Sequence, residues 1–188
     1  KRVVLRAKLG ISNESKVILA IGRLVWEKDY INLIESFVLA SARIPDLLLV
    51  IIGDGPERKS LVRYVNQLDI TDRVQFLGKQ SPSYPWFSIA DLFVSSSVRE
   101  GFGLVLVEAM ASGRPIVATN CGIADEFDKN LVDFVEPSSP GLLSKAIVTS
   151  IQKDKETKRA NALKSLGFVR NKFSMDKIVL KWHELYES

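Results

Sequence analysis

Two carboxylates flank a glycine-rich turn in the stretch REGFGLVLVEAMASGRP, residues 99–115. Glu100 precedes the turn at 101–103, and Glu108 follows it inside an apolar run whose spacing predicts a helix over Leu104–Ser112. The start of a helix presents unpaired backbone N–H groups and a positive dipole end, which together suit phosphate. Carboxylates accept hydrogen bonds from hydroxyls. The stretch therefore predicts a ligand with a diphosphate in the middle and hydroxylated rings at both ends, as in a nucleotide sugar.

The position of Glu108 leaves two interpretations open. Glu108 shares one helical stripe with Leu104 and Ala111, where a glutamate is costly unless it is paired or accepts hydrogen bonds from a ligand. In the purely structural alternative, Glu100 favours the helix dipole and Glu108 makes a buried salt bridge. In both interpretations the glycines of Gly101-Phe102-Gly103 allow a tight turn.

Two cations follow an apolar, strand-like run in the segment GRLVWEKDY. Gly22 allows close approach of a ligand to the backbone, Arg23 offers a planar fork of donors, and Lys28 offers a point charge. This combination suits a pyrophosphate. The alternative, equally open from these residues alone, is two ordinary surface cations.

Six short runs rich in Val, Ile and Leu predict the strands that position these groups. The first, second and fifth are apolar throughout, which is typical of strands buried on both faces of a parallel sheet. Helical patterns alternate with them, so we expect repeated βαβ units and a doubly wound α/β domain with helices on both faces. The expected strands are Lys16–Gly22, Leu47–Gly53, Arg73–Gly78, Asp91–Ser97, Pro115–Thr119 and Asp133–Pro137.

The helices expected between the strands are Tyr30–Arg43, Glu57–Leu68 and Leu104–Ser112, and the last third of the chain reads as three further helices. Their buried faces are predicted to hold Ile31, Ile34, Phe37 or Val38 and Ala42 in one case, and Leu61, Val65 and Leu68 in the other. We expect a single domain over 1–188, with a core of about 16–152 and a helical tail over 153–188. Ligands of such sheets bind beyond the carboxyl ends of the strands, where the residues described above lie.

Composition excludes several other classes of function. The 188 residues carry a net charge of +4, and the densest charged segment, KDKETKR, alternates in sign, so no nucleic-acid site is expected. One cysteine, Cys121, allows neither an internal disulfide nor a metal cluster, and it reads as a packing residue. The sequence contains neither GxGxxG nor GxxxxGK[ST], which argues against a dinucleotide oxidoreductase and a P-loop nucleotidase.

The segments GRLVWEK, GDGP, VQFLG, ADLFVSSS and above all EGFGLVLVEAMASGRPIVAT resemble the C-terminal, donor-binding domain of glycosyltransferase family 4 (glycosyl transferases group 1), which are retaining enzymes of the GT-B fold. The resemblance runs from about Val17 to Ile151. It implies that Arg23 and Lys28 bind the diphosphate and stabilise the leaving group, and that Glu100 binds the transferred sugar. It further implies phosphate contacts from the amides of Phe102, Gly103 and Leu104, ribose contacts from Glu108, and a base facing the backbone near Phe76 and Leu77.

Three departures from the family pattern affect the predicted sugar pocket. Asp29 stands where the family usually has glycine, Gly122-Ile123 replaces a frequent glycine pair, and ADEF replaces the usual PE. The last two lie in the loop at 120–127, which is expected to shape the pocket.

We expect no metal, because the cations and amides already neutralise a diphosphate and no acidic triplet suggests a divalent cation. We expect a cytoplasmic enzyme, with the inner face of a membrane as an alternative location. A uridine diphosphate sugar ranks first as donor and a guanosine diphosphate sugar second. The acceptor is expected to be a glycan or a lipid-linked molecule, bound through an N-terminal domain that this chain lacks, so the chain alone is expected to bind donor without turnover. The alternatives are a related GT-B epimerase or phosphorylase, or a non-catalytic nucleotide-binding scaffold.

Overall fold

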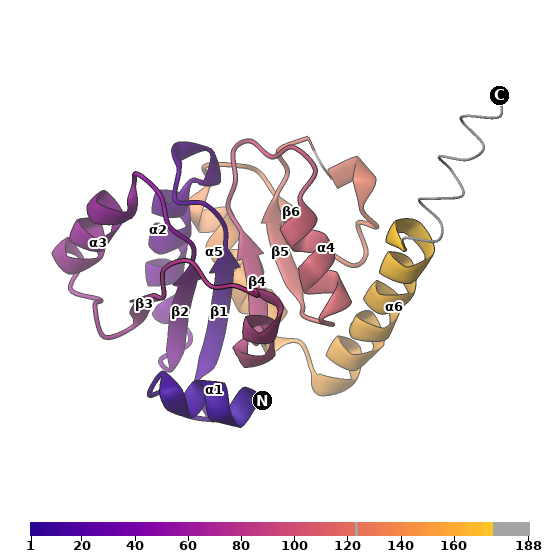
Figure 1. The fold of residues 1–188 in the computed structure, drawn as a ribbon, viewed down its shortest axis with the longest axis horizontal. Helices are drawn as coiled ribbons and strands as arrows, with labels where there is room; N and C mark the ends of the chain where they lie inside the picture. Colours follow the sequence, from indigo (N-terminus) through magenta and orange to yellow (C-terminus); the bar gives the residue numbers. More distant parts are fainter. Residues whose placement is uncertain (123, 175–188) are drawn as a thin grey trace.

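All six predicted strands form, and each pairs in parallel with its neighbour. The computed structural model describes residues 1–122 and 124–174. Within them a six-stranded sheet has the order β3-β2-β1-β4-β5-β6 (Figure 1). The strands are β1 (Lys16–Ile21), β2 (Leu47–Ile52), β3 (Val74–Phe76), β4 (Leu92–Ser95), β5 (Ile116–Thr119) and β6 (Asp133–Val135).

The order in which the strands are added to the sheet reverses at β1 and β4. These two strands are parallel neighbours although they are distant in sequence. Leu19 of β1 lies opposite Phe93 of β4 and also opposite Val50 of β2. Helical crossovers leave on opposite sides at such a point, so a crevice opens beyond the carboxyl ends of these two strands. The residues that follow β1 and β4 are therefore brought together by topology alone.

Helices cover both faces of the sheet, which confirms the doubly wound α/β class. One face packs against α2 (Tyr30–Ser41), α3 (Arg58–Gln67) and α5 (Pro140–Gln152). The other face packs against α1 (Arg2–Lys8), α4 (Leu104–Ala111) and α6 (Lys155–Phe173). Three short 3-10 turns, none of them predicted, complete the described elements: η1 (Trp26–Lys28), η2 (Tyr84–Ile89) and η3 (Ala124–Glu126).

The predicted helix faces were only partly right. In α2 the buried side chains include Leu33, Ile34 and Phe37, whereas Ile31 and Ala42 are exposed. The helix is apolar around most of its circumference because it packs against the sheet and α5 together, so periodicity did not single out one face. Leu68 is also exposed, because it stands at the end of α3, beyond its last turn. The final helix expected after Ser174 lies outside the described residues.

Candidate functional site

One open hollow at the carboxyl ends of β1 and β4 contains all four charged residues singled out from the sequence. Arg23 and Lys28 line it from the β1 side, and Glu100 and Glu108 line it from the segment after β4. The hollow measures about 380 Å³. Its other lining residues are Ile21, Gly22, Ser83, Phe102, Gly103, Leu104 and Val105. Gly101 stands in the same turn and is exposed beside it.

Lys28 and Glu100 form an ion pair at this hollow. The Lys28 Nζ donates to Glu100 Oε2, and the side chains are 21% and 14% exposed. The hydroxyl of Ser97 donates to the same carboxylate oxygen at 3.3 Å. Glu100 therefore pairs with a cation on the other side of the crevice. The structural alternative had assumed instead that its carboxylate interacts with the dipole of α4.

Backbone contacts fix the two loops that carry this pair. The carbonyl of Glu27 accepts the N–H of Val98 at 2.8 Å and that of Arg99 at 3.3 Å. The Ser96 hydroxyl donates to the Lys28 carbonyl at 2.7 Å. The segment after β1 and the segment after β4 thus form one hydrogen-bonded unit, which holds the ion pair in place.

Gly103 is the N-cap residue directly before α4 and has a positive φ of +74°, which glycine tolerates best. It supplies no side-chain cap, so the first N–H groups of α4 are left for a ligand or for water. The Gly103 carbonyl accepts the N–H of Leu106 at 2.8 Å, which closes the first turn of the helix. A diphosphate at this helix start would meet open donors with a positive dipole behind them.

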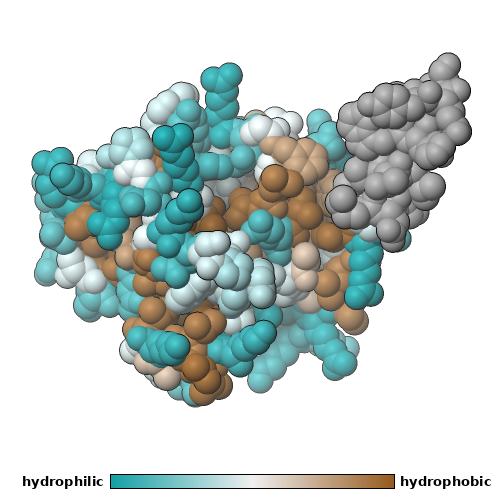
Figure 2. Space-filling view, viewed as in Figure 1, coloured by the Kyte–Doolittle hydropathy of each residue, from teal (hydrophilic) through white to brown (hydrophobic). Residues whose placement is uncertain are grey.

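The stripe that holds Glu108 faces solvent and the hollow, which corrects the expectation of an apolar, buried stripe. Leu104 is 68% exposed, and Glu108 and Ala111 are exposed as well. The hydrophobic area over α4 in Figure 2 agrees with this exposure. Glu108 accepts a hydrogen bond from the Ser83 hydroxyl at 3.2 Å. No cation within the described ranges pairs with it, so the buried salt bridge does not form and the carboxylate is accessible to a ligand.

A buried tyrosine beneath the site was missed by sequence reasoning. Tyr30 lies behind Gly22, where a Cβ added to the glycine would approach the phenol oxygen at 3.1 Å and the Lys28 Cε at 3.6 Å. Burial, with the charge of Glu100 as a second cause, raises the pKa of Tyr30 well above its usual range. In the sequence Tyr30 looks like an ordinary apolar residue of α2. The one signal of a place near the site is that it is the first residue of this helix, directly after Asp29.

A second hollow of about 380 Å³ adjoins the first and shares Ile21, Gly22 and Arg23 with it. Its far side is formed by Asp54, Lys79 and Gln80 together with Ile52 and Gly53. Sequence reasoning did not single out Lys79 or Gln80. Arg23 therefore lines both hollows.

Phe76 and Leu77 line neither hollow, although both lie close to the second one in sequence. The backbone N–H of Leu77 donates to Ile51 at 2.9 Å, and its carbonyl accepts from the Gln80 side chain at 2.8 Å. Their predicted contact with a base stays a prediction.

Glycines at the end of β2 keep this edge of the sheet compact. A Cβ on Gly53 would lie 1.8 Å from the Gly22 carbonyl oxygen, and one on Gly55 would lie 2.3 Å from the Leu24 carbonyl oxygen. The two glycines of the GDGP segment are therefore required by the packing of this edge.

Cys121 and Asp29, which the sequence also singled out, contribute to packing and to helix capping. Cys121 is half-buried, and burial, followed by the charge of Glu100, raises the pKa of its thiol, as suits a packing residue. Asp29 has a φ of +44°, a left-handed conformation that glycine adopts most readily, in agreement with the glycine that the resemblance leads one to expect there. Its carboxylate caps α2 by accepting the Asn32 N–H at 3.3 Å, and it also accepts from Ser138 at 3.0 Å.

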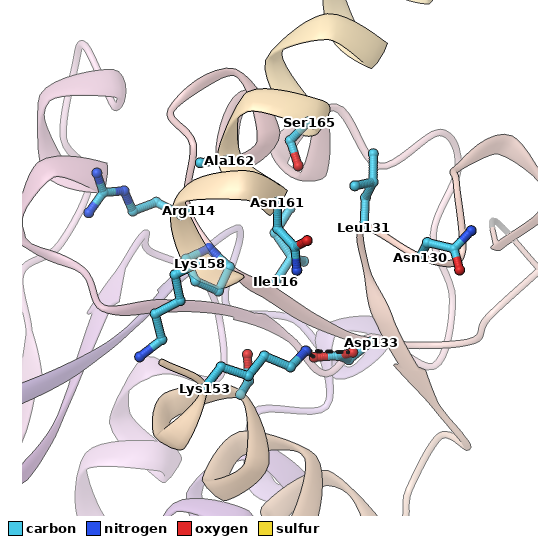
Figure 3. Close-up of a pocket in the computed structure, with 12 residues that line it drawn as sticks. Arg114, Ile116, Asn130, Leu131, Asp133, Lys153, Lys158, Asn161, Ala162 and Ser165 are labelled. Atoms are coloured by element: carbon cyan, nitrogen blue, oxygen red, sulfur yellow. Dashed lines mark hydrogen bonds and ion pairs between the residues drawn. The ribbon is translucent and has the colours of Figure 1, made fainter. Parts of the chain in front are cut away.

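A separate, small cavity lies under α6, near the amino end of β5 (Figure 3). It measures about 20 Å³, which is room for one water molecule. Lys153 in its wall pairs with Asp133 at 2.8 Å. Its size makes it part of the packing rather than a substrate site.

In the part of the chain that the structure describes, no group of three or more His, Cys, Asp and Glu residues is arranged to hold a metal ion. None of the helices over the same residues is both long enough and apolar enough to cross a membrane.

Comparisons with known proteins match this chain to one family. The family model described as glycosyl transferases group 1 matches residues 2–164. N-acetyl-alpha-D-glucosaminyl L-malate synthase of Bacillus anthracis is 31% identical over 186 residues, which cover 97% of this chain and 48% of that enzyme.

Two solved structures are similar over nearly the whole chain. Anabaena Alr3699/HepE in complex with UDP and glucose has a TM-score of 0.87 at 27% identity, covering 99% of this chain and 51% of that one. The C-terminal domain of the group 1 protein LpcC from Francisella tularensis has a TM-score of 0.79 at 27% identity, covering 93% and 94%. The chain therefore spans about half the length of the Bacillus and Anabaena proteins, and its fold is one half of a GT-B architecture.

Proposed function

The chain belongs to the glycosyl transferases group 1 family, and we propose that it is the donor-binding half of a retaining glycosyltransferase. Its ligand is a nucleoside diphosphate sugar, whose sugar passes to a hydroxyl group of an acceptor. The observation that carries the proposal is that Arg23, Lys28, Glu100 and Glu108 line one hollow together with the start of α4.

The diphosphate binds between the two cations and the open N–H groups of α4. Arg23 and Lys28 approach from the β1 side, and the amides of Phe102, Gly103 and Leu104 approach from the other. Charge-assisted hydrogen bonds of this kind are shorter and stronger than neutral ones. Because no side chain caps α4, the phosphate oxygens do not have to displace an internal partner there.

The carboxylates hold the two ends of the ligand. Glu108 accepts from ribose hydroxyls, a role supported by its exposure and by its lack of a charged partner among the described residues. Glu100 accepts from hydroxyls of the transferred sugar once Lys28 has turned to the diphosphate. The base enters the adjoining hollow beside Arg23, toward Lys79 and the backbone near Phe76 and Leu77.

Transfer breaks the bond between the anomeric carbon and the diphosphate oxygen. Positive charge develops on the sugar ring and negative charge on the departing oxygen. Arg23, Lys28 and the helix amides stabilise that negative charge, so the cradle itself supplies the neutralisation and no metal is needed. Glu100 positions the sugar and stabilises the charge on its ring.

The donor is a uridine diphosphate sugar in this proposal, which is supported by the UDP and glucose bound to the similar Anabaena protein. The acceptor is a glycan, a lipid-linked molecule or a similar hydroxylated compound. It binds through the part of a longer enzyme that corresponds to the other half of the relatives. The 188-residue chain alone binds donor and transfers no sugar.

Calorimetric titration of the chain with UDP, GDP and UDP-glucose tests the proposal. Saturable binding of at least one nucleotide with one site per chain is the expected result. Heats no larger than dilution for every nucleotide would instead favour a scaffold that kept the fold.

A further inference from the structure

The turn before α4 contains a single side chain. Gly101 and Gly103 have none, and a Cβ added at Gly101 would meet open space. Phe102 is therefore the one residue of the turn that can anchor it through side-chain packing. Its ring is 42% exposed and lines the hollow that holds Glu100 and Glu108.

Phe102 packs against the last residue of α6. The ring centroids of Phe102 and Phe173 lie 5.7 Å apart at an interplanar angle of 90°. This edge-to-face geometry is one that aromatic pairs prefer, because the positive ring edge meets the negative ring face. A helix that begins at Lys155, far along the chain, thus reaches the turn at the proposed phosphate site.

Phe173 is itself held firmly. Its ring centroid lies 6.2 Å from that of the buried Phe127 and 5.8 Å from that of Phe168. The Lys172 ammonium lies 5.6 Å from the centroid of the Phe173 ring and donates to the Glu126 carbonyl at 2.6 Å. These contacts tie the end of α6 to the loop after β5.

The body of α6 is also close to α4. A Cβ at Gly113, just beyond α4, would lie 3.3 Å from the Cβ of Ala162 in α6. Figure 1 shows the two helices as neighbours on the same side of the sheet. The end of α6 is therefore a fixed support for the turn rather than a loose extension.

We infer that Phe173 is a positioning residue for donor binding, which acts through Phe102. Its ring holds the turn at 101–103 in the conformation that aims the first N–H groups of α4 into the hollow. This inference rests on the proposed function of that site. A protein whose binding-competent conformation is populated for only part of the time binds its ligand more weakly, in proportion to that fraction. Losing one edge-to-face contact is therefore expected to weaken UDP binding roughly three- to tenfold.

The test compares Phe173→Leu with Phe168→Leu in the 188-residue chain. Both variants remove a ring from the same helix, but the aromatic contacts described here join Phe168 to Phe173 and not to Phe102. Phe173→Tyr keeps the ring and serves as the rescue variant. Calorimetry with UDP gives the affinity, and hydrogen exchange without nucleotide gives the state of the turn. The amides of Leu106 and Val107 donate to the Gly103 carbonyl, so their exchange reports whether the turn is closed.

Phe173→Leu is expected to bind UDP roughly three- to tenfold more weakly and to exchange faster at Leu106 and Val107. Phe173→Tyr should match the unaltered chain in both measurements. Phe168→Leu, which removes only one of the rings that support Phe173, should have a smaller effect than Phe173→Leu in both measurements. Unchanged exchange and affinity in Phe173→Leu would overturn the inference, and so would an equal effect of Phe168→Leu. If the unaltered chain binds none of UDP, GDP and UDP-glucose, the proposed function fails, while the exchange measurement still decides whether Phe173 orders the turn.

Discussion

Lys28 and Glu100 stand 72 positions apart in the chain and meet as an ion pair at the mouth of the hollow. The pair joins the loop after β1 to the loop after β4. These two neighbouring strands mark the point where the strand order of the parallel sheet reverses. The pair balances the charges of Lys28 and Glu100 across the hollow. In the proposed function, a bound diphosphate would give the cation a new partner and leave the carboxylate available to hydroxyls of the sugar.

Removing the cation of this pair should weaken nucleotide binding. Lys28→Met keeps the aliphatic length that lies beside Gly22 and removes the charge. A hydrogen bond to a charged group contributes about 1.5–3 kcal/mol, so we expect UDP to bind about 10- to 100-fold more weakly by calorimetry. Lys59→Met, an exposed lysine of α3, is the matched control and should leave affinity unchanged. Equal UDP affinities of the unaltered chain, Lys28→Met and Lys59→Met would show that Lys28 does not contact the nucleotide.

Glu108 should discriminate between ribose and a ring without hydroxyls. The unaltered chain is expected to bind UDP more tightly than 2′,3′-dideoxyuridine diphosphate, by about 1.5–3 kcal/mol for a hydrogen bond to a charged acceptor. Glu108→Gln should lose most of that preference, because the neutral amide accepts more weakly. A variant that still prefers UDP to the dideoxy compound by the same factor would place the ribose elsewhere.

Gly53 should tolerate no side chain. A Cβ there would lie 1.8 Å from the Gly22 carbonyl oxygen at a φ of +140°, so we expect Gly53→Ala to lower the free energy of unfolding by at least about 2 kcal/mol. Gly167 is the matched control, since it lies within α6 with open space at its Cβ position.

Gly167→Ala should raise stability by about 0.5–1 kcal/mol, because alanine loses less backbone entropy in a helix. Urea unfolding followed by circular dichroism measures both glycine variants. A Gly53→Ala protein as stable as the parent would contradict the close approach of the backbone at Gly53 to the Gly22 carbonyl.

Tyr30 should make stability depend on pH in the alkaline range. Its folded pKa lies above the unfolded value of about 10, so its contribution is fully present below pH 10. It is lost as pH rises beyond 10, because the unfolded chain releases the phenol proton first. Urea unfolding of the parent and of Tyr30→Phe between pH 8 and pH 11 should show a steeper loss above pH 10 in the parent. Parallel curves would mean that the phenol is not desolvated.

The strands, their parallel arrangement and the grouping of site residues could be predicted from the sequence because they follow from local patterns. Fully apolar runs such as Leu47–Ile52 mark strands buried on two faces, and parallel strands place the residues after their carboxyl ends at one edge. Gly22, Arg23 and the turn at 101–103 could therefore be placed near one another before any coordinates were known.

Features that depend on packing between distant elements could not be predicted in this way. The exposure of Glu108 depends on how α4 rests on the sheet, and its apolar neighbours Leu104 and Ala111 gave a misleading signal of burial. The position of Tyr30 behind Gly22 and the contact of Phe173 with Phe102 join segments that have no common pattern in sequence. The face of α2 was ambiguous because that helix is covered on two sides.

The most direct test of the central claim is an NMR titration of the backbone amides of the 188-residue chain with UDP. If the diphosphate binds at the start of α4, the amide signals of Gly103 and Leu104 should shift saturably, with one binding constant shared by Gly22 and Arg23. Saturable shifts that leave these four amides unmoved and gather instead around the cavity near Arg114 and Asn161 would contradict the account.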